Sequence, residues 1–309
     1  MKLTKEYREK VREAILEHRD SFPSLSDKAF GQTMGISASV FSRLKKGETE
    51  RIAADIFWIE QGRKLNVDLG TITWRPARTQ VYEQIEDNIT FCKEYQKATI
   101  MNDPCGIGKS FCTRHIVRTL NDAFYMDCSQ ARTKHKFIRA LAQTLGMDNR
   151  GKVEDVKENL KYYIKLMNKP FIALDDAGYL NKNVFIEIIE IWNATEDRCG
   201  WMLIGDGSLR KKIERGINNE KEGQEALFNR FSEEFVSNVP PTRDEKREFY
   251  QQLVGDIANA NLNNKTKIDM MVQKCLTKDR KLRHLKTLIQ MEHDNEQSVN
   301  SKNPVQQAV

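Results

Sequence analysis

The segment Asp103-Pro-Cys-Gly-Ile-Gly-Lys-Ser110 has the residue types and the spacing of a loop that binds phosphate groups. Its two glycines let backbone N–H groups approach phosphate oxygens, and the helix that follows adds partial positive charge at its N-terminus. Lys109 can reach the β- and γ-phosphates of a nucleotide, while the hydroxyl of Ser110 can bind Mg²⁺. The motif predicts a Walker A site for ATP and Mg²⁺, made of Gly106, Ile107, Gly108, Lys109, Ser110 and Phe111.

One position of this loop departs from the usual pattern G-x-x-x-x-G-K-[ST], because Asp103 stands where the pattern has glycine. Aspartate tolerates the left-handed backbone conformation better than most residues. Its side chain is nevertheless expected to bring negative charge toward the phosphate groups. On this basis Asp103 is predicted to weaken nucleotide binding.

A pair of carboxylates ends the later apolar segment Lys169-Pro-Phe-Ile-Ala-Leu-Asp-Asp-Ala177. We expect this segment to form a strand beside the phosphate loop. Asp175 would then bind Mg²⁺, and Asp176 would position or deprotonate the water that attacks the γ-phosphate. Glutamate is the usual residue at the second place, so the shorter Asp176 predicts weak hydrolysis that a partner or DNA stimulates.

Two further residues are candidates for catalysis together with Asp176. Asp206 ends the apolar segment Gly200–Gly207, where it can orient the attacking water, although Asp-Gly is also an ordinary turn dipeptide. Arg230 follows Ala226-Leu-Phe-Asn, and in an oligomer it can stabilise transition-state charge on a neighbouring subunit's nucleotide. The alternative for Arg230 is a surface residue without a role in catalysis.

The elements that must position these residues follow from the hydrophobic pattern. Between residues 79 and 238, short apolar segments alternate with amphipathic ones, which predicts an α/β P-loop core around a parallel sheet. Residues 67–78 are predicted to be a linker and residues 239–293 a small helical lid. The Asn-, Gln- and Ser-rich residues 294–309 are predicted to be a disordered tail. The predicted strands are 98–101, 123–126, 171–174 and 201–204.

Residues 1–66 are predicted to form an all-α helix-turn-helix domain. One helix is expected over 4–18, a second should end at Gly35, and a third should begin after the N-cap Ser37. The outward side of the third helix is polar and basic, which suits contacts with DNA. A small protein-binding module is the alternative. The DNA candidates on this helix are Ser39, Ser42, Arg43 and Lys45.

The composition of the 309 residues narrows the class of protein further. Hydrophobic residues make up 39% and charged residues 30%, and no apolar stretch is long enough to span a membrane. The six cysteines show no metal-binding spacing, which indicates reduced thiols in the cytoplasm. Residues 263–288 carry eight basic and two acidic residues and so account for the whole net charge of +6. That stretch is either a surface for a polyanion or a solvated helix face.

In order and spacing, five segments together resemble the Mu B-like AAA+ ATPases of DNA transposition, with TnsC and IstB as more distant relatives. These segments are the helix-turn-helix, the phosphate loop, residues 171–180, residues 203–206 and residues 227–230. The resemblance implies phosphate and Mg²⁺ contacts at Lys109 and Ser110, and a Walker B pair at Asp175 and Asp176. It further implies that Asp206 lies at sensor 1, Arg230 at the arginine finger, and Arg283 near the sensor 2 arginine of the lid.

The resemblance also implies a function. Members of this family form ATP-dependent homo-oligomeric filaments on double-stranded DNA, with nucleotide at the subunit interfaces, present target DNA to a transposase, and dissociate when ATP is hydrolysed. Their DNA contacts come from basic loops, read phosphates rather than sequence, and are sensitive to salt. The matching residues here are Arg132, Lys134, Lys136, Arg150 and Lys152.

Two other functions stay open at the level of sequence. A nucleotide-regulated transcription factor would use the helix-turn-helix to bind a defined operator as a dimer. A helicase loader would need a helicase partner and a different N-terminal domain. The helix-turn-helix followed directly by a P-loop core favours the first hypothesis, DNA transposition.

Overall fold

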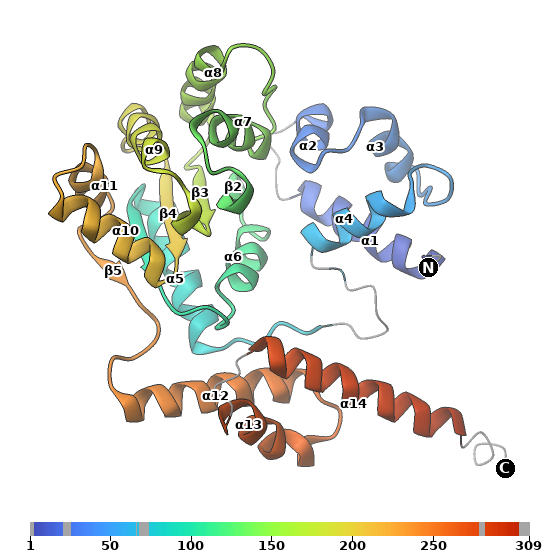
Figure 1. Ribbon diagram of the computed structural model, residues 1–309. Coiled ribbons are helices and arrows are strands. Elements are labelled where there is room, and N and C mark those ends of the chain that lie inside the picture. Colours follow the sequence, from blue (N-terminus) through green and yellow to red (C-terminus); the bar gives the residue numbers. More distant parts are fainter. Residues whose placement is uncertain (1–2, 21–25, 66, 68–73, 278–281, 303–309) are drawn as a thin grey trace.

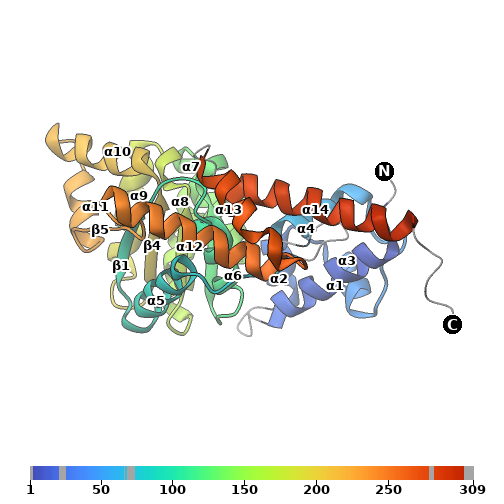
Figure 2. The same cartoon turned by 90° about the horizontal axis from the view of Figure 1, so that it is seen from below.

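The computed structural model describes residues 3–20, 26–65, 67, 74–277 and 282–302, and the chain forms three parts (Figure 1). Four N-terminal helices pack beside a central α/β part, and three C-terminal helices lie below it in Figure 1. Figure 2, seen from below, shows α14 running from the α/β part along the N-terminal helices. The N-terminal helices are α1 (Lys5–Asp20), α2 (Asp27–Met34), α3 (Ala38–Lys45) and α4 (Asp55–Lys64).

The central part is built on a five-stranded parallel sheet with the strand order β2-β3-β4-β1-β5. Its strands lie where the sequence predicts them, except for the short β5, which the sequence does not predict. β4 lies between β1 and β3, so the strand that carries Asp175 is not the direct neighbour of the strand before the phosphate loop. The strands are β1 (Ala98–Asn102), β2 (Ala123–Asp127), β3 (Phe171–Asp175), β4 (Gly200–Gly205) and β5 (Phe235–Val236).

Helices cover both faces of the sheet, because successive residues of each strand point to opposite sides. On β3, Phe171 and Ala173 pack with the helices on one side, and Ile172 and Leu174 pack with those on the other. One side holds α5 (Gln80–Tyr95) and α6 (Lys109–Val117). The other holds α7 (Lys134–Thr144), α8 (Val153–Leu166), α9 (Lys182–Ala194), α10 (Gly207–Asn218) and α11 (Gln224–Arg230).

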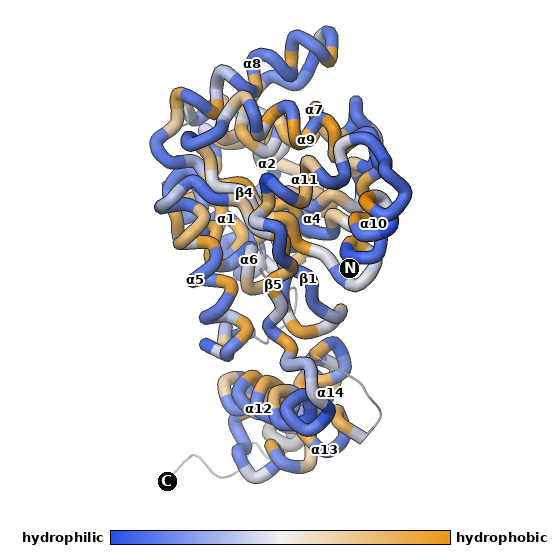
Figure 3. Tube along the Cα trace, turned by 90° about the vertical axis from the view of Figure 1, so that its left-hand side faces the viewer, coloured by the Kyte–Doolittle hydropathy of each residue, from blue (hydrophilic) through white to orange (hydrophobic). Residues whose placement is uncertain are grey.

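Most of these helices are amphipathic. In Figure 3 the tube alternates between hydrophobic and hydrophilic residues along the helices. The charged faces are turned to solvent and the apolar faces to the sheet, which is how a chain with this much charge still builds a core. Within the described residues, no helix is both long enough and apolar enough to cross a membrane.

The turn between α2 and α3 forms as the sequence predicts. Gly35 has a φ of 71°, a left-handed conformation that ends α2, and its N–H donates to carbonyls of that helix. Ser37 caps α3, because its side chain accepts a hydrogen bond from the N–H of Val40. Phe41 and Leu44 of α3 are buried, so the opposite side of this helix faces solvent. The N-terminal part is therefore helical and contains a helix-turn-helix.

The N-terminal helices dock against α6, the helix that follows the phosphate loop. Arg118, directly after α6, donates a hydrogen bond of 2.6 Å from its guanidinium to the carbonyl of Leu65 at the end of α4. His18 of α1 packs edge-on against Phe30, with 5.8 Å between the ring centroids. Burial and, second, the charge of Arg118 lower the pKa of His18 to about 3. A neutral histidine is thus part of this contact.

Stability should therefore depend on pH through His18. In the unfolded chain the ring binds a proton below its ordinary pKa of 6.5, whereas in the folded chain it stays neutral down to about 3. The free energy of unfolding should fall as the pH drops through this window, by up to about 2 kcal/mol at pH 5. Denaturant titrations at pH 5 and at a pH above 6.5 measure this difference in stability. His18→Leu should remove it, whereas His135→Leu, an exposed control on α7, should not.

The C-terminal part consists of α12 (Arg243–Asn261), α13 (Ile268–Thr277) and α14 (Leu282–Lys302), in the region predicted to be a helical lid. The predicted disordered tail begins at residue 294, but α14 continues to Lys302. No glycine or proline lies between residues 294 and 302, so nothing in the sequence ends a helix that starts in the packed lid. The remainder of the predicted tail, 303–309, lies outside the described residues.

Candidate nucleotide-binding site

A cleft of about 920 Å³ opens where the carboxyl ends of the strands meet the N-terminal helices and the lid. All three parts of the chain contribute to its walls. The phosphate loop supplies the residues from Cys105 to Phe111, and the strand ends supply Tyr125, Asp127, Asp175 and Asp176. The N-terminal helices supply Tyr7, Gly62 and Arg63, and the lid supplies Ile257, Leu282 and Arg283.

The phosphate loop connects β1 to α6. Gly106 and Gly108 have φ values of 83° and 99°, conformations that side chains disfavour, which explains the two glycines. Lys109 is buried, and its Nζ donates to the backbone carbonyls of Asp103 at 2.6 Å and Pro104 at 3.0 Å. Burial lowers the pKa of Lys109, while nearby carboxylates, foremost Asp103, oppose this shift. Ser110 and Phe111 follow in the first turn of α6 and line the cleft.

The carboxylate of Asp103 does not point toward the cleft, contrary to the expectation from the sequence. It is fully buried and accepts hydrogen bonds from Ser237, Asn238 and Val239, directly after β5. The carboxylate therefore does not face the phosphate site, although its charge still acts on Lys109, and the predicted weakening of nucleotide binding stays a prediction. The partners that hold this side chain come from a distant part of the chain.

Asp175 ends β3 and is held in one orientation by two hydrogen bonds. The hydroxyl of Tyr125, on β2, donates to its Oδ2 at 2.6 Å, and the N–H of Asp176 donates to its Oδ1 at 2.9 Å. Burial, followed by the charge of Asp175, raises the pKa of Tyr125, so the phenol remains a donor. A carboxylate accepts more than two hydrogen bonds, so Asp175 keeps lone pairs for a cation.

The oxygen atoms of Asp175 and Ser110 are the donor type that Mg²⁺ prefers, and both residues line the cleft. Magnesium in nucleotide sites is held by one or two carboxylates together with phosphate oxygens and water. Two protein oxygens are therefore a suitable set, and these residues fit the ion.

Asp176 directly follows β3 in a left-handed conformation, with φ at 53° and ψ at 34°. Aspartate adopts this conformation more readily than most residues, which points its carboxylate to the cleft beside Asp175. Partial burial, together with the charges of Asp175 and Asp127, raises the pKa of Asp176 above its usual range. A carboxylate with a raised pKa beside the phosphate loop is suited to accept a proton.

Asp206 follows β4 and lies next to the phosphate loop. Its Oδ2 accepts a hydrogen bond from Cys105 Sγ at 3.2 Å, and its Oδ1 accepts one from the N–H of Ser208 at 2.9 Å. These contacts, chiefly the one with Ser208, lower the pKa of Asp206. Asp206 thus caps α10 and also contacts the loop.

Residues 103–213, from the phosphate loop to α10, match the family described as AAA domain. This region has the AAA+ P-loop fold, with a parallel sheet flanked by helices. None of the curated proteins matches the chain.

Two solved structures are similar to the chain. The Orc1 protein of Aeropyrum pernix in complex with DNA has 13% identity and a TM-score of 0.44, over 75% of this chain and 70% of that chain. NtrX from Brucella abortus in complex with ATP has 13% identity and a TM-score of 0.37, over 78% of this chain and 60% of that chain.

The lid closes one side of the AAA+ domain's cleft. The N–H of Leu282, the first residue of α14, donates to the carbonyl of Gly106 at 3.3 Å. Arg283 follows it on α14 and lines the cleft, so the structure places this residue with the phosphate loop. Its side chain is exposed, which leaves the guanidinium accessible to a phosphate.

Arg230 is not among the residues that line the cleft. It ends α11, which Figure 1 shows on the side of the AAA+ domain opposite the N-terminal helices. Its Nε donates to Asn193 Oδ1 at 2.6 Å, and its guanidinium lies 5.6 Å from the ring centroid of Trp192. Within one chain the structure does not bring Arg230 to the phosphate loop.

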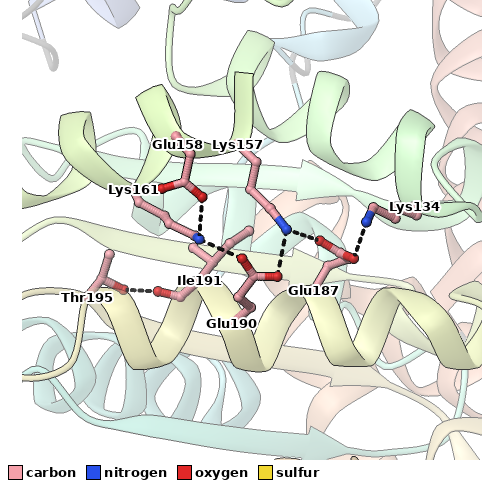
Figure 4. A network of polar contacts seen from close by, with 8 residues as sticks. All are labelled: Lys134, Lys157, Glu158, Lys161, Glu187, Glu190, Ile191 and Thr195. Carbon is pink, nitrogen blue, oxygen red and sulfur yellow. Dashed lines mark hydrogen bonds and ion pairs between the residues drawn. The ribbon is translucent and has the colours of Figure 1, made fainter. Parts of the chain in front are cut away.

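Lys134, one of the predicted DNA contacts, belongs to a network of ion pairs between helices (Figure 4). Its Nζ lies 2.9 Å from Glu187, a buried carboxylate of α9 that also pairs with Lys157 of α8. Glu190 extends the network by contacting both Lys157 and Lys161. Lys134 therefore stabilises the packing of α7 against α9, and it is less available to DNA than its sequence position suggests.

The other predicted DNA contacts are accessible. Arg132 is exposed and lies 4.8 Å from the ring centroid of Tyr179, and Lys136 and Lys152 are exposed as well. Arg150 forms two hydrogen bonds of 3.0 Å with Asp148. On α3, Ser39, Ser42 and Lys45 are exposed and Arg43 is half-buried; Arg43 pairs with Glu48, and Lys45 pairs with Asp27.

Sequence patterns alone miss several residues of the cleft. In the sequence Tyr125 is an ordinary strand residue, although its hydroxyl donates the hydrogen bond that orients Asp175. Arg114 lies one helical turn after Ser110, and its guanidinium is 5.4 Å from the centroid of the Tyr125 ring. That spacing is a signal that sequence reasoning can use, because residues four apart share a helix face. Arg63 could not be found this way, since only docking of the N-terminal helices brings it to the cleft.

Proposed function

We propose that the chain is an ATPase that binds ATP and Mg²⁺ in this cleft and assembles on double-stranded DNA in its ATP-bound state. The proposal rests on one observation, which is that residues of two motifs line the same cleft. Lys109 and Ser110 come from the phosphate loop, and Asp175 and Asp176 come from the end of β3.

The geometry supports a separate role for each residue. Backbone N–H groups of the loop and the N-terminus of α6 bind the phosphates, and Lys109 contacts the β- and γ-phosphates. Ser110 and Asp175 hold Mg²⁺, which supplies charge neutralisation at the phosphates when bound. Asp176 accepts the proton of the attacking water, because it is the cleft carboxylate with a raised pKa. The carboxylate of Asp206 accepts a hydrogen bond from Cys105 of the phosphate loop, and through this contact it responds to the presence of the γ-phosphate.

The position of Arg230 supports a homo-oligomer with nucleotide between subunits. Charge on a transferring γ-phosphate is stabilised best by a cation that touches it directly. Arg230 lies outside the cleft of its own chain and on the far side of the domain. In a head-to-tail arrangement of subunits, this side meets the cleft of a neighbour.

The N-terminal helices and the loop between α7 and α8 together support DNA binding. Helix α2 contacts α7, and the charge of Lys28 contributes, after Arg150, to a pKa of about 2 for Asp148. The helix-turn-helix and the basic residues Arg150 and Lys152 thus lie on neighbouring segments of the surface. Basic residues on such a surface bind phosphates and not a particular sequence.

The more specific role, delivery of target DNA to a transposase by a filament that hydrolysis disassembles, rests on the resemblance described above. A transcription regulator that uses α3 on one operator is the second candidate, because the polar side of α3 faces solvent. It predicts binding at one site that saturates as a dimer.

Electron microscopy of the protein with DNA of mixed sequence tests the proposal. Filaments should cover the DNA with Mg²⁺ and ATP and be absent with ADP or without nucleotide. Arg230→Ala should shorten or abolish the filaments, whereas Arg247→Ala, an exposed control on α12, should not. Particles at a single site, independent of nucleotide, would favour the transcription regulator and contradict assembly.

A further inference from the structure

Asp103 joins the phosphate loop to the entrance of the lid. Its buried Oδ1 accepts from Ser237 Oγ at 2.7 Å and from the N–H of Val239 at 3.1 Å. Its Oδ2 accepts from the N–H and the side-chain amide of Asn238 at 2.9 and 2.6 Å. Four donors of three consecutive residues thus meet one carboxylate, and glycine, the usual residue at this position, makes none of these contacts.

The backbone of Asp103 contacts the catalytic side of the loop at the same time. Its carbonyl accepts the hydrogen bond from Lys109 Nζ at 2.6 Å, and its N–H donates to the carbonyl of Gly205 at 3.2 Å. Gly205 ends β4 and precedes Asp206. One residue therefore connects the phosphate-binding lysine, the strand of Asp206 and the lid entrance.

A short segment with two prolines connects these contacts to α12. Pro240 and Pro241 separate Val239 from α12, and proline fixes the backbone angle φ, so this connection is stiff. A second part of the lid also contacts the phosphate loop, because the N–H of Leu282, the first residue of α14, donates to the carbonyl of Gly106. The lid is thus attached to the loop at two points, its entrance and the start of its last helix.

We propose that Asp103 is a positioning residue that couples the state of the phosphate loop to the position of the lid. The inference rests on the proposed function, since it requires that ATP binds in the cleft. A bound nucleotide draws Lys109 from the carbonyl of Asp103 to the phosphates. The loop then rearranges around Asp103, and the hydrogen bonds of its carboxylate carry this change through residues 237–239 to α12.

Hydrogen–deuterium exchange of the full chain, with and without Mg²⁺ and ATP, tests this coupling. In the unmodified protein, ATP should slow exchange in the loop, 105–113, and in α12, 243–261, by about tenfold. Asp103→Asn keeps the size of the side chain but places an NH₂ group against the donors of Asn238. This variant should retain the slowing in the loop and lose most of it in α12. Asp87→Asn, an exposed aspartate of α5, is the control.

A second variant covers the case in which Asp103→Asn does not fold. Ser237→Ala removes one donor from the surface side of the contact. It should reduce the ATP-dependent slowing of exchange in α12, but by less than Asp103→Asn does. A residue that only stabilises the fold would instead raise exchange in both nucleotide states equally. Slowing in α12 that matches the unmodified protein, in the aspartate variant or, failing that, in the serine variant, would overturn the coupling.

The unmodified protein separates failure of the coupling from failure of the proposed function. If ATP slows exchange in the loop but not in α12, the coupling is wrong and ATP binding stands. If ATP leaves the loop unprotected as well, both the coupling and the proposed function are overturned.

Discussion

Replacing Lys109 with alanine is expected to abolish nucleotide binding, with the dissociation constant for ATP rising about 100-fold or more. Lys109 is the buried cation of the phosphate loop, and its Nζ is 2.6 Å from the carbonyl of Asp103. Alanine removes both the positive charge and the hydrogen-bond donor from a buried position, where water does not easily replace them. The triphosphate would then meet the carboxylates Asp175 and Asp176 without an opposing lysine.

Titration with a fluorescent ATP analogue measures this loss directly. Lys212→Ala is a matched control, because the Nζ of the half-buried Lys212, like that of Lys109, donates to two backbone carbonyls, those of Gly178 and Leu180. Lys212 does not line the cleft, so its replacement should leave the affinity within about threefold of the unmodified protein. Equal affinity of the Lys109→Ala variant and the unmodified protein would remove Lys109 from the site.

The fold follows from the sequence wherever its signals are local. Apolar segments of four residues between amphipathic ones predict four of the five strands, and Gly35 and Ser37 predict the turn between α2 and α3. The order of the strands is not a local property. The insertion of β4 between β1 and β3 depends on which helices cover which face, and the sequence pattern does not specify this.

The candidate site shows the same limit at the level of single side chains. The loop motif predicts where Lys109 and Ser110 lie, because a strand, two glycines and a helix define that geometry by themselves. The orientation of Asp103 depends on Asn238, which is 135 positions away in the chain, and that of Asp175 depends on Tyr125, which is 50 positions away. Each partner is an ordinary residue in its own segment, so only the assembled fold reveals the contact.

Replacing Asp176 with asparagine should separate ATP binding from hydrolysis. The variant should bind ATP within about threefold of the unmodified protein and hydrolyse it about 100-fold more slowly or worse, because a general base contributes at least that factor. Asparagine also tolerates the left-handed backbone conformation that this residue has, so the fold should not change. Filaments formed with ATP should therefore last longer.

The control for this substitution is Asp197→Asn. Asp197 has a φ of 55°, close to the 53° of Asp176, but it is exposed and does not line the cleft. Its replacement tests the effect of the same chemical change on the same type of backbone. Single-turnover hydrolysis should be unchanged in this variant, and a defect equal to that of Asp176→Asn would contradict the role of Asp176.

The pH dependence of hydrolysis gives an independent test of the same role. A general base works in its deprotonated form, so the rate should fall as the pH drops through the pKa of Asp176. Partial burial and, next, the charge of Asp175 raise this pKa, so the fall should begin at a higher pH than for an ordinary aspartate. Asp176→Asn has no carboxylate to protonate, and its residual rate should lack this acidic limb. An acidic limb with the same midpoint in both proteins would assign the titration to another group and leave Asp176 without its proposed function.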